Sequence, residues 1–260
     1  MEVVPKDAAT TMVVRDTASG LEVLMLRRNS RSAWASSIHL FPGGAVDDDD
    51  RSAEMARLCT GRDDAGASEL LGVEAGGLGH FVAAIRECYE EAGILLARHD
   101  GRPLSLHDRA MAERFERWRR ALNRNEVRFA DIAAAESLSF ALDELGYVAH
   151  WITPEGEPRR YDTRFFVAVL PDGQEALHDD VEVVASGWIR PEEALSRGAR
   201  GEIELWAPTM KNLEAIARFS TAAEVMAAAE RASVQTVIPR LVEDEGGMRI
   251  VLPGDEGYEQ

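Results

Sequence analysis

The sequence predicts an α+β fold, with strands near both ends of the chain and helices between them. Residues 10–15 (TTMVVR) and 22–28 (EVLMLRR) are rich in strand-forming residues, and residues 16–20 between them are typical of a turn. From His80 onward, apolar residues recur at spacings of three and four, which indicates an amphipathic helix. Strand-like segments return at residues 148–153, 163–170 and 182–190.

The first half of the chain contains a segment rich in glycine and proline, which interrupt regular secondary structure. Residues 36–40 favour a strand that leads into Phe-Pro-Gly-Gly at 41–44, which predicts a loop or tight turn. Residues 54–59 predict a short helix, and six glycines between 61 and 79 favour a long connection. The helix that begins near His80 is expected to stop at Gly93, because glycine is the preferred residue after a helix C-terminus.

The second half alternates between helical and extended patterns. Apolar residues between 106 and 145 predict two or three helices that cap the core. Pro191, followed by two acidic residues, is typical of the first turn of a short helix. Residues 208–219 and 222–232 are also expected to be helical. A short strand at 248–252 is expected to pair with 236–242 around the turn at 244–247.

Composition and charge narrow the class of function. The 260 residues carry a net charge of −17, with a pI of about 4.8, so the surface should repel nucleic acid and anionic membranes. A free polyphosphate would be repelled too, unless carboxylates hold divalent cations beside it. The two cysteines, Cys59 and Cys88, form no metal-type cluster, and neither a signal peptide nor a membrane-length apolar run is visible. These features predict a cytoplasmic protein.

A row of acids on the helix after His80 is the strongest chemical signal. Glu87, Glu90 and Glu91 are related as i, i+3 and i+4, so they share one face and repel one another. A bound divalent cation would turn this repulsion into coordination, and Arg86 could hold one carboxylate through a bidentate pair. The alternative is a solvated charged face. The apolar residues 83–85, the stop at Gly93 and the upstream glycines all favour a site over that alternative.

These residues resemble the Nudix box, G-x5-E-x7-R-E-U-x-E-E-x-G-U, where U is apolar. Gly44 matches the first glycine, and residues 86–94 (RECYEEAGI) match the whole second half. The resemblance implies a Nudix fold of the α/β/α type, with a mixed β-sheet between helices and the box as a loop–helix–loop. It also implies Mg²⁺ or Mn²⁺ bound by Glu90, Glu91 and the Gly44 carbonyl, with Glu87 as a further ligand or as the general base for water.

The box is split by an insertion. Arg86 stands 42 positions after Gly44, which is 28 more than in the usual pattern. The first box glutamate therefore has no single counterpart: Asp50 has the expected offset from Gly44, whereas counting back from Arg86 gives Leu78. We expect one domain over residues 1–260, with insertions at about 46–78 and 100–146 and a C-terminal helical extension at about 205–260.

A split box resembles the Nudix subgroup that includes a mammalian peroxisomal enzyme acting on coenzyme A and acyl-CoA esters. The segments 159–166, 206–209 and 252–256 are similar to that subgroup as well. The resemblance implies a small nucleoside diphosphate derivative as substrate, with a coenzyme A type first. NADH, ADP-ribose and nucleotide sugars stay open, because Ala33 and Ser37 stand where many CoA-cleaving relatives have arginine and glycine. Homodimers are frequent among such enzymes, so a homodimer is also open.

Further site residues are expected from loops and strand ends. Glu182 is a candidate extra metal ligand, with Asp179 and Asp180 as competitors. Core packing is favoured over stacking on a base for three aromatic residues, Trp151, Phe165 and Trp206. The candidate phosphate-binding residues, because arginine suits bidentate contacts, are Arg27, Arg28, Arg160 and Arg164, with Arg159 beside them.

Two rival functions use the same scaffold. A non-catalytic nucleotide sensor would have no need of the complete set of three glutamates. An isomerase acting on a prenyl diphosphate would need a cysteine and an acid in its pocket, whereas Cys88 occupies the apolar position of the helix and is expected to be buried.

Overall fold

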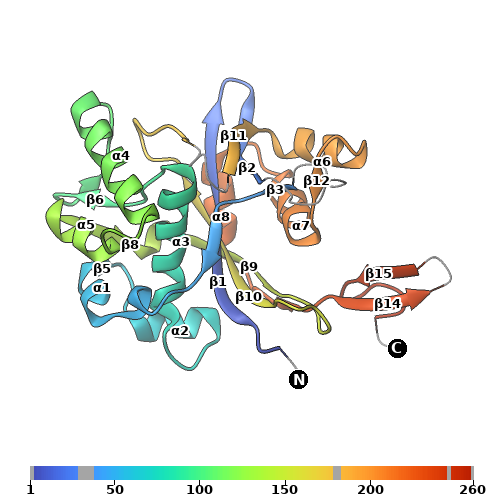
Figure 1. Cartoon of the computed structure of the whole chain (residues 1–260). Helices are drawn as coiled ribbons and strands as arrows, with labels where there is room; N and C mark the ends of the chain where they lie inside the picture. Colours follow the sequence, from blue (N-terminus) through green and yellow to red (C-terminus); the bar gives the residue numbers. More distant parts are fainter. Residues whose placement is uncertain (1–2, 29–37, 178–182, 245–246, 259–260) are drawn as a thin grey trace.

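Three layers make up the structure, a computed structural model that describes residues 3–28, 38–177, 183–244 and 247–258. A mixed sheet lies in the middle, and helices cover both of its faces (Figure 1). This confirms the predicted α+β arrangement with a sheet between helices. The central strand order is β12-β3-β2-β1-β10-β9-β13, with β4 beside β1 and β11 beside β2.

The first two strands form the predicted hairpin, and β1 continues the sheet by pairing in parallel with β10. Strands 146–152 and 161–169 then form an antiparallel pair with a register shift near Phe165. The strands of the central sheet are β1 (Lys6–Thr17), β2 (Gly20–Arg28), β3 (Ile38–Leu40), β4 (Gly43–Ala45), β9 (Gly146–Ile152), β10 (Tyr161–Val169), β11 (Val183–Ile189), β12 (Glu204–Leu205) and β13 (Thr236–Val237).

Alternation along the strands builds two hydrophobic cores, one on each face of the sheet. Successive side chains of a strand point to opposite faces, so Phe165 and Phe166 enter different cores. Phe166 contacts Phe81 of α3 (Gly77–Ala92), the helix that carries the second half of the box, with 4.6 Å between ring centroids. Phe165 packs on the other face, with Leu213 and Val225 from C-terminal helices. The sheet is thus packed against helices on both faces.

The first face is covered by α3 and by the two insertions around it. The long connection expected at 61–79 is wrong in part, because residues 64–71 form a helix. Its N-terminus is capped by Asp63, whose side chain accepts from the Gly66 amide, and Gly72 ends it at φ +67°. Glycine content alone therefore concealed a well-capped helix. The helices are α1 (Ala53–Leu58), α2 (Asp64–Leu71), α3 (Gly77–Ala92), α4 (Arg109–Asn123) and α5 (Phe129–Ala135), with a 3₁₀ turn η1 (Asp49–Arg51).

The insertion at 106–145 contains the expected helices, α4 and α5, but it ends in a strand. That strand joins a small separate sheet of order β5-β8-β6-β7, which packs beside the first core. Its members are β5 (Cys59–Thr60), β6 (Arg98–His99), β7 (Arg102–Pro103) and β8 (Leu138–Ala141), followed by the 3₁₀ turn η2 (Leu142–Glu144).

The second face is covered by α6 (Pro191–Ala199), α7 (Ala207–Ile216) and α8 (Ala222–Ala229). The predicted C-terminal hairpin is confirmed as β14 (Arg240–Asp244) and β15 (Gly247–Val251), and it projects from the body (Figure 1). Residues 236–237, expected in that hairpin, instead extend the central sheet beside β9.

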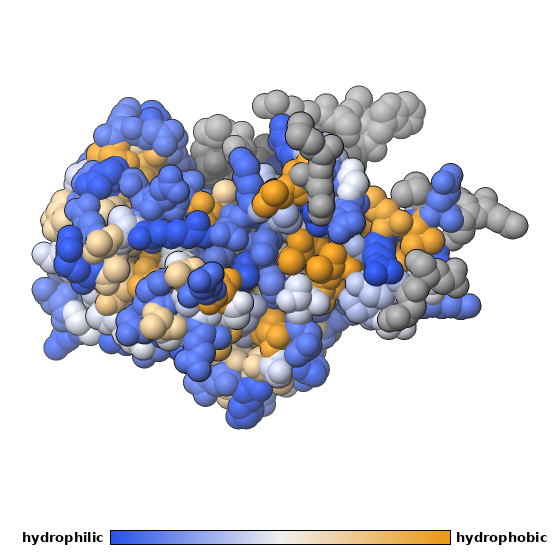
Figure 2. All heavy atoms as spheres, turned by 90° about the horizontal axis from the view of Figure 1, so that it is seen from below, coloured by the Kyte–Doolittle hydropathy of each residue, from blue (hydrophilic) through white to orange (hydrophobic). Residues whose placement is uncertain are grey.

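The surface is consistent with a strongly charged chain. Seen from below, it is mainly hydrophilic, and its hydrophobic side chains gather in separate patches (Figure 2). Within the described residues, the helices are all too short or too polar to cross a bilayer.

A buried histidine lies where α3 crosses the sheet. The His80 side chain is 2% exposed and stands 3.7 Å from Asp7 and 3.5 Å from Arg164. Burial, and after it the nearby Arg164 cation, together lower the pKa of His80 from 6.5 to about 4. The folded protein therefore keeps His80 neutral at pH values where an exposed histidine is charged.

We predict that His80 makes the protein sensitive to mild acid. Below pH 6.5 His80 is protonated in the unfolded chain but stays neutral in the folded chain. The free energy of unfolding therefore falls as the pH drops toward 4. This contribution amounts to roughly 3 kcal/mol by pH 4. In urea titrations at pH 7 and pH 4.5, His80→Gln should lose less stability than wild type. His99→Gln, at a partly exposed site, is the control. Equal losses in wild type and His80→Gln would contradict the prediction.

Candidate active site

The box helix is fixed by apolar packing on one side, which leaves its acids on the other. Phe81, Ile85 and Cys88 are fully buried in the first core, as the spacing predicts. The Thr11 hydroxyl of β1 donates to the Ala84 carbonyl at 3.0 Å and ties the helix to the sheet. Gly93 ends the helix at φ +71°, as expected. Apolar packing and the Thr11 hydrogen bond therefore fix the position and rotation of α3, independently of its acidic side chains.

Arg86 joins the acids of the helix to Ala45 and Asp50, near the start of the predicted insertion. Its Nε and Nη2 donate to the two Asp50 carboxylate oxygens at 2.9 and 2.8 Å. Nη2 also donates to the Ala45 carbonyl at 2.9 Å. Nη1 donates to Glu87 at 2.8 Å and to Glu90 at 3.2 Å. The bidentate partner of Arg86 is thus Asp50, the residue at the expected offset from Gly44, rather than one of the three box glutamates.

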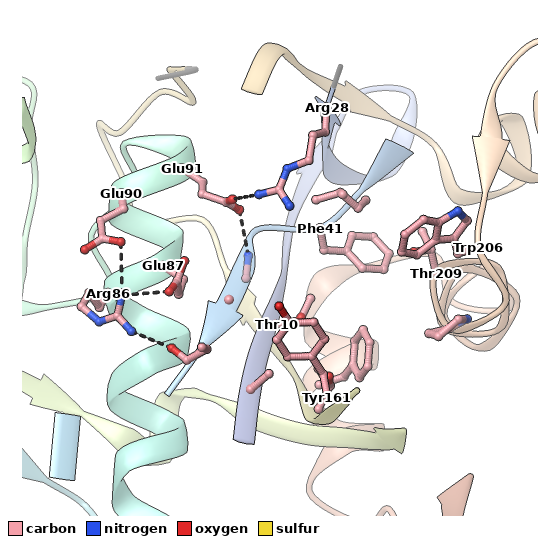
Figure 3. A pocket seen from close by; sticks show the side chains of 18 of the residues that line it. Thr10, Arg28, Phe41, Arg86, Glu87, Glu90, Glu91, Tyr161, Trp206 and Thr209 are labelled. Carbon is pink, nitrogen blue, oxygen red and sulfur yellow. Dashed lines mark hydrogen bonds and ion pairs between the residues drawn. The ribbon is translucent and has the colours of Figure 1, made fainter. Parts of the chain in front are cut away.

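Glu91 ties the helix to the Phe-Pro-Gly-Gly segment. One carboxylate oxygen accepts from Arg28 at 2.7 Å, and the other accepts from the Gly43 amide at 3.0 Å. Residues 41–42 form the expected bend, but Gly43–Ala45 is a short strand on β1 rather than loop. The backbone of this segment therefore runs alongside the carboxylates of α3 (Figure 3).

Gly44 leaves the space that the Glu87 carboxylate occupies. A Cβ at this position would lie 2.5 Å from the Glu87 carboxyl carbon, closer than atoms can pack. Gly43 is similarly confined, since its Cβ would lie 2.5 Å from the Ala9 carbonyl oxygen. The two glycines allow backbone and carboxylate to approach within reach of a shared ligand.

The carboxylates have the character of a cation site. Burial raises the pKa of Glu90 to about 7 against the lowering effect of Arg86, and Glu87 adds to the rise. Burial also raises the pKa of Glu87. Two partly desolvated acids therefore share one arginine, and a divalent cation would stabilise their charged forms. As the described side chains stand, no three of them converge on one point, because Glu91 faces Arg28 while the other two face Arg86.

A cavity of about 670 Å³ opens beside these acids, and its lining separates the candidate arginines. Arg28 lines it, with 38% of its side chain exposed. Arg27, its neighbour on β2, points to the opposite side of the sheet, as strand alternation requires. Arg160 and Arg164 are buried outside the cavity. Arg160 donates to the Thr153 and Val3 carbonyls, and Arg164 pairs with Asp162. Of the four candidates, only Arg28 reaches the cavity.

Sequence reasoning missed a second organising arginine, Arg119 of α4. Its side chain is 2% exposed and donates to the backbone carbonyls of Glu90 and Glu91 at 3.0 and 3.2 Å. A cation at a helix C-terminus stabilises the carbonyls that lack partners there. The amphipathic pattern of α4 gave no sign that one of its arginines points inward.

The aromatic candidates divide between core and cavity. Trp151 is buried in the second core, as favoured from the sequence. Phe165 belongs to that core and also lines the cavity, whereas Trp206 is 58% exposed at the cavity wall. Core packing is therefore the wrong expectation for Trp206. Glu182, Asp179 and Asp180 lie outside the described residues, as do Ala33 and Ser37.

Comparison with known proteins identifies relatives of this chain. Residues 73–216 match a family model described as the NUDT19 Nudix domain. Acyl-coenzyme A diphosphatase NUDT19 of Gallus gallus is 29% identical over 274 residues, covering 91% of this chain and 72% of that protein. Its Homo sapiens namesake is 25% identical, covering 93% and 73%. The crystal structure of a NUDIX hydrolase from Alicyclobacillus acidocaldarius has a TM-score of 0.67 at 29% identity, covering 86% of this chain and 96% of that one.

We predict that Asp50→Asn destabilises the protein, whereas Asp49→Asn does not. Asp50 is 1% exposed and pairs with the buried guanidinium of Arg86, so Asp50→Asn leaves that charge without its main partner. Breaking a buried ion pair in this way lowers the free energy of unfolding by about 3 kcal/mol. Asp49 is exposed and carries the same charge one residue earlier. Urea denaturation of both variants measures the difference. Equal midpoints for the two variants would contradict the role given to Asp50.

Proposed function

Because the chain belongs to the Nudix hydrolases, in the family of the NUDT19 Nudix domain, we propose that it cleaves the diphosphate linkage of coenzyme A or acyl-CoA esters. The observation that carries the proposal is the assembly of Glu87, Glu90 and Glu91 with Gly44 on one wall of the cavity. The substrate class is supported by the names of the relatives, which are acyl-coenzyme A diphosphatases.

The residues divide the reaction between them. Water attacks one phosphorus of the linkage, and the bond from that phosphorus to the bridging oxygen breaks. Glu87 or Glu90 takes the proton that water loses, since both carboxylates face the cavity and hydrogen-bond to Arg86. Arg28 lies beside Glu91 at the cavity wall, where its guanidinium suits a phosphate oxygen. Two phosphate-bearing fragments result, one with the adenosine and one with the pantetheine arm.

The donor groups on the same wall have the chemistry that a divalent cation requires. Glu87, Glu90, Glu91 and the Gly44 carbonyl would hold it, because hard oxygen ligands are those that Mg²⁺ and Mn²⁺ prefer. When bound, the cation acidifies water and neutralises phosphate charge. Arg86 and Asp50 orient the ligands from behind and are positioning residues in this scheme.

Neither rival function has comparable support. An isomerase would need a cysteine in the cavity, and Cys88 is fully buried in the first core instead. A non-catalytic sensor would have no use for three glutamates turned to one wall. NADH, ADP-ribose and nucleotide sugars stay in the test panel as alternative diphosphates.

The proposal predicts metal-dependent cleavage that is lost in Glu90→Gln. Wild type is incubated with coenzyme A, acyl-CoA, NADH, ADP-ribose and nucleotide sugars in Mg²⁺, Mn²⁺ or EDTA. Removing a ligand or base should lower kcat about 100- to 10,000-fold. Glu113→Gln, an exposed glutamate on α4, is the matched control and should keep full activity. A folded wild type that binds a nucleotide but cleaves no member of the panel would support the sensor instead.

A second prediction concerns the close approach at Gly44. Gly44→Ala should fold but lose most of its activity, because the new methyl group displaces the Glu87 carboxylate. Gly187→Ala is the control, since a Cβ there meets nothing within 4 Å. Circular dichroism checks the fold and phosphate release checks the activity. Wild-type turnover in Gly44→Ala would contradict a role for Glu87 in the reaction.

A further inference from the structure

The cavity has a second wall, opposite α3, that is built from aromatic rings. Phe41, Tyr161, Phe165 and Trp206 come from three separate segments, since Tyr161 and Phe165 both belong to β10, and all four line the cavity. Figure 3 labels Phe41, Tyr161 and Trp206. Phe41 and Phe165 are buried to within a few per cent, so they serve as the base of this wall. Tyr161 and Trp206 are 39% and 58% exposed, which leaves much of their surface open to a ligand. Two of these rings, Phe41 and Phe165, thus belong to the second core and also line the cavity, whereas Tyr161 and Trp206 are partly open to it.

Trp206 is held in place although it is exposed. It is the N-cap residue of α7, and Pro208 in the first turn restricts the backbone that follows. Its indole Nε1 donates to the Glu204 carboxylate at 3.2 Å. Leu205 and Ala207, on either side, pack against the second core. Of the four tryptophans in the described part of the chain, 118, 151, 188 and 206, only the last is exposed.

Among the described residues, the charged side chains that line the cavity lie toward α3. They are Arg28, Asp47, Arg86, Glu87, Glu90 and Glu91. The described polar groups on the aromatic side are uncharged and include the hydroxyl groups of Thr163 and Thr209. A ligand that spans the cavity therefore needs a phosphate-bearing part at one end and a neutral, flat part at the other. Among the parts of a coenzyme A molecule, the adenine ring alone is flat and aromatic.

We propose that Trp206 and Tyr161 form a stacking site for the adenine base of the substrate. Aromatic side chains bind bases through their flat faces, and each such contact commonly changes affinity by roughly 5- to 100-fold. The proposal rests on the diphosphatase function, because it assigns the base end of that same substrate. It makes Trp206 a binding residue that selects adenine nucleotides and takes no part in the chemical step.

Binding of adenosine 3′,5′-bisphosphate tests the stacking site without any turnover. Calorimetric titrations in EDTA compare wild type with Trp206→Ala and Trp206→Phe. Trp206→Ala should bind roughly 5- to 100-fold more weakly, and Trp206→Phe should retain most of the affinity because it keeps a ring. Ribose 5-phosphate, which lacks the base, should show no difference between wild type and Trp206→Ala.

Met210→Ala is the matched control, since Met210 is an exposed apolar residue of the same helix that does not line the cavity. It should bind the bisphosphate as wild type does. Equal affinity of wild type and Trp206→Ala would overturn the proposal.

Kinetics then separate this inference from the proposed function. If wild type cleaves acyl-CoA, Trp206→Ala should raise KM by the same factor as the binding loss and leave kcat nearly unchanged. If the effect on KM instead grew with acyl-chain length while bisphosphate binding stayed normal, the wall would hold the acyl arm and the adenine assignment would be wrong. If wild type cleaved no coenzyme A substrate, the proposed function would fail, and the bisphosphate titration would still decide the stacking site.

Discussion

The buried guanidinium of Arg86 is the interaction on which the rest of the site depends. Moving a cation out of water is unfavourable unless the cation is paired and hydrogen-bonded in the protein. Arg86 meets that condition through Asp50, the Ala45 carbonyl and two glutamates of its own helix. These partners come from β4, from η1 and from α3, so one side chain fixes three segments relative to one another. Any shift among them would leave a buried charge without compensation.

This constraint explains how the box tolerates a long insertion. Asp50 lies near the start of the segment predicted to hold the insertion, and the chain returns to α3 at Gly77, so Asp50 and Arg86 pair across the intervening residues. The inserted helices α1 and α2 pack near the N-terminal half of α3 (Figure 1), and none of the described residues between Asp47 and Arg86 lines the cavity. The entropic cost of closing a loop rises only slowly with its length. The added residues can therefore be accommodated away from the cavity without moving the carboxylates of α3.

Local patterns in the sequence predicted the parts of the fold that depend on local physics. The hairpin, the box helix with its stop at Gly93 and the C-terminal hairpin each follow from periodicity or turn chemistry. Helix α2 was missed because glycine content hid its caps. The inward turn of Arg119, the burial of Arg160 and Arg164 and the pairing of Asp50 depend on tertiary contacts that spacing does not encode. Arg27 and Arg28 show the limit most clearly, since strand alternation requires opposite faces but does not say which face holds the cavity.

Trp206 shows why the overall charge and the local site have to be considered together. A chain of net charge −17 repels anions, and the acids on α3 add to that repulsion within the cavity. In the proposed reaction a diphosphate would be stabilised by divalent cations and by Arg28, and those contacts would be common to every diphosphate. Discrimination among substrates therefore has to come from the uncharged wall, where the ligands differ. An exposed tryptophan contributes little to folding at that position, and its fixed orientation makes sense as a surface for recognising one end of the substrate.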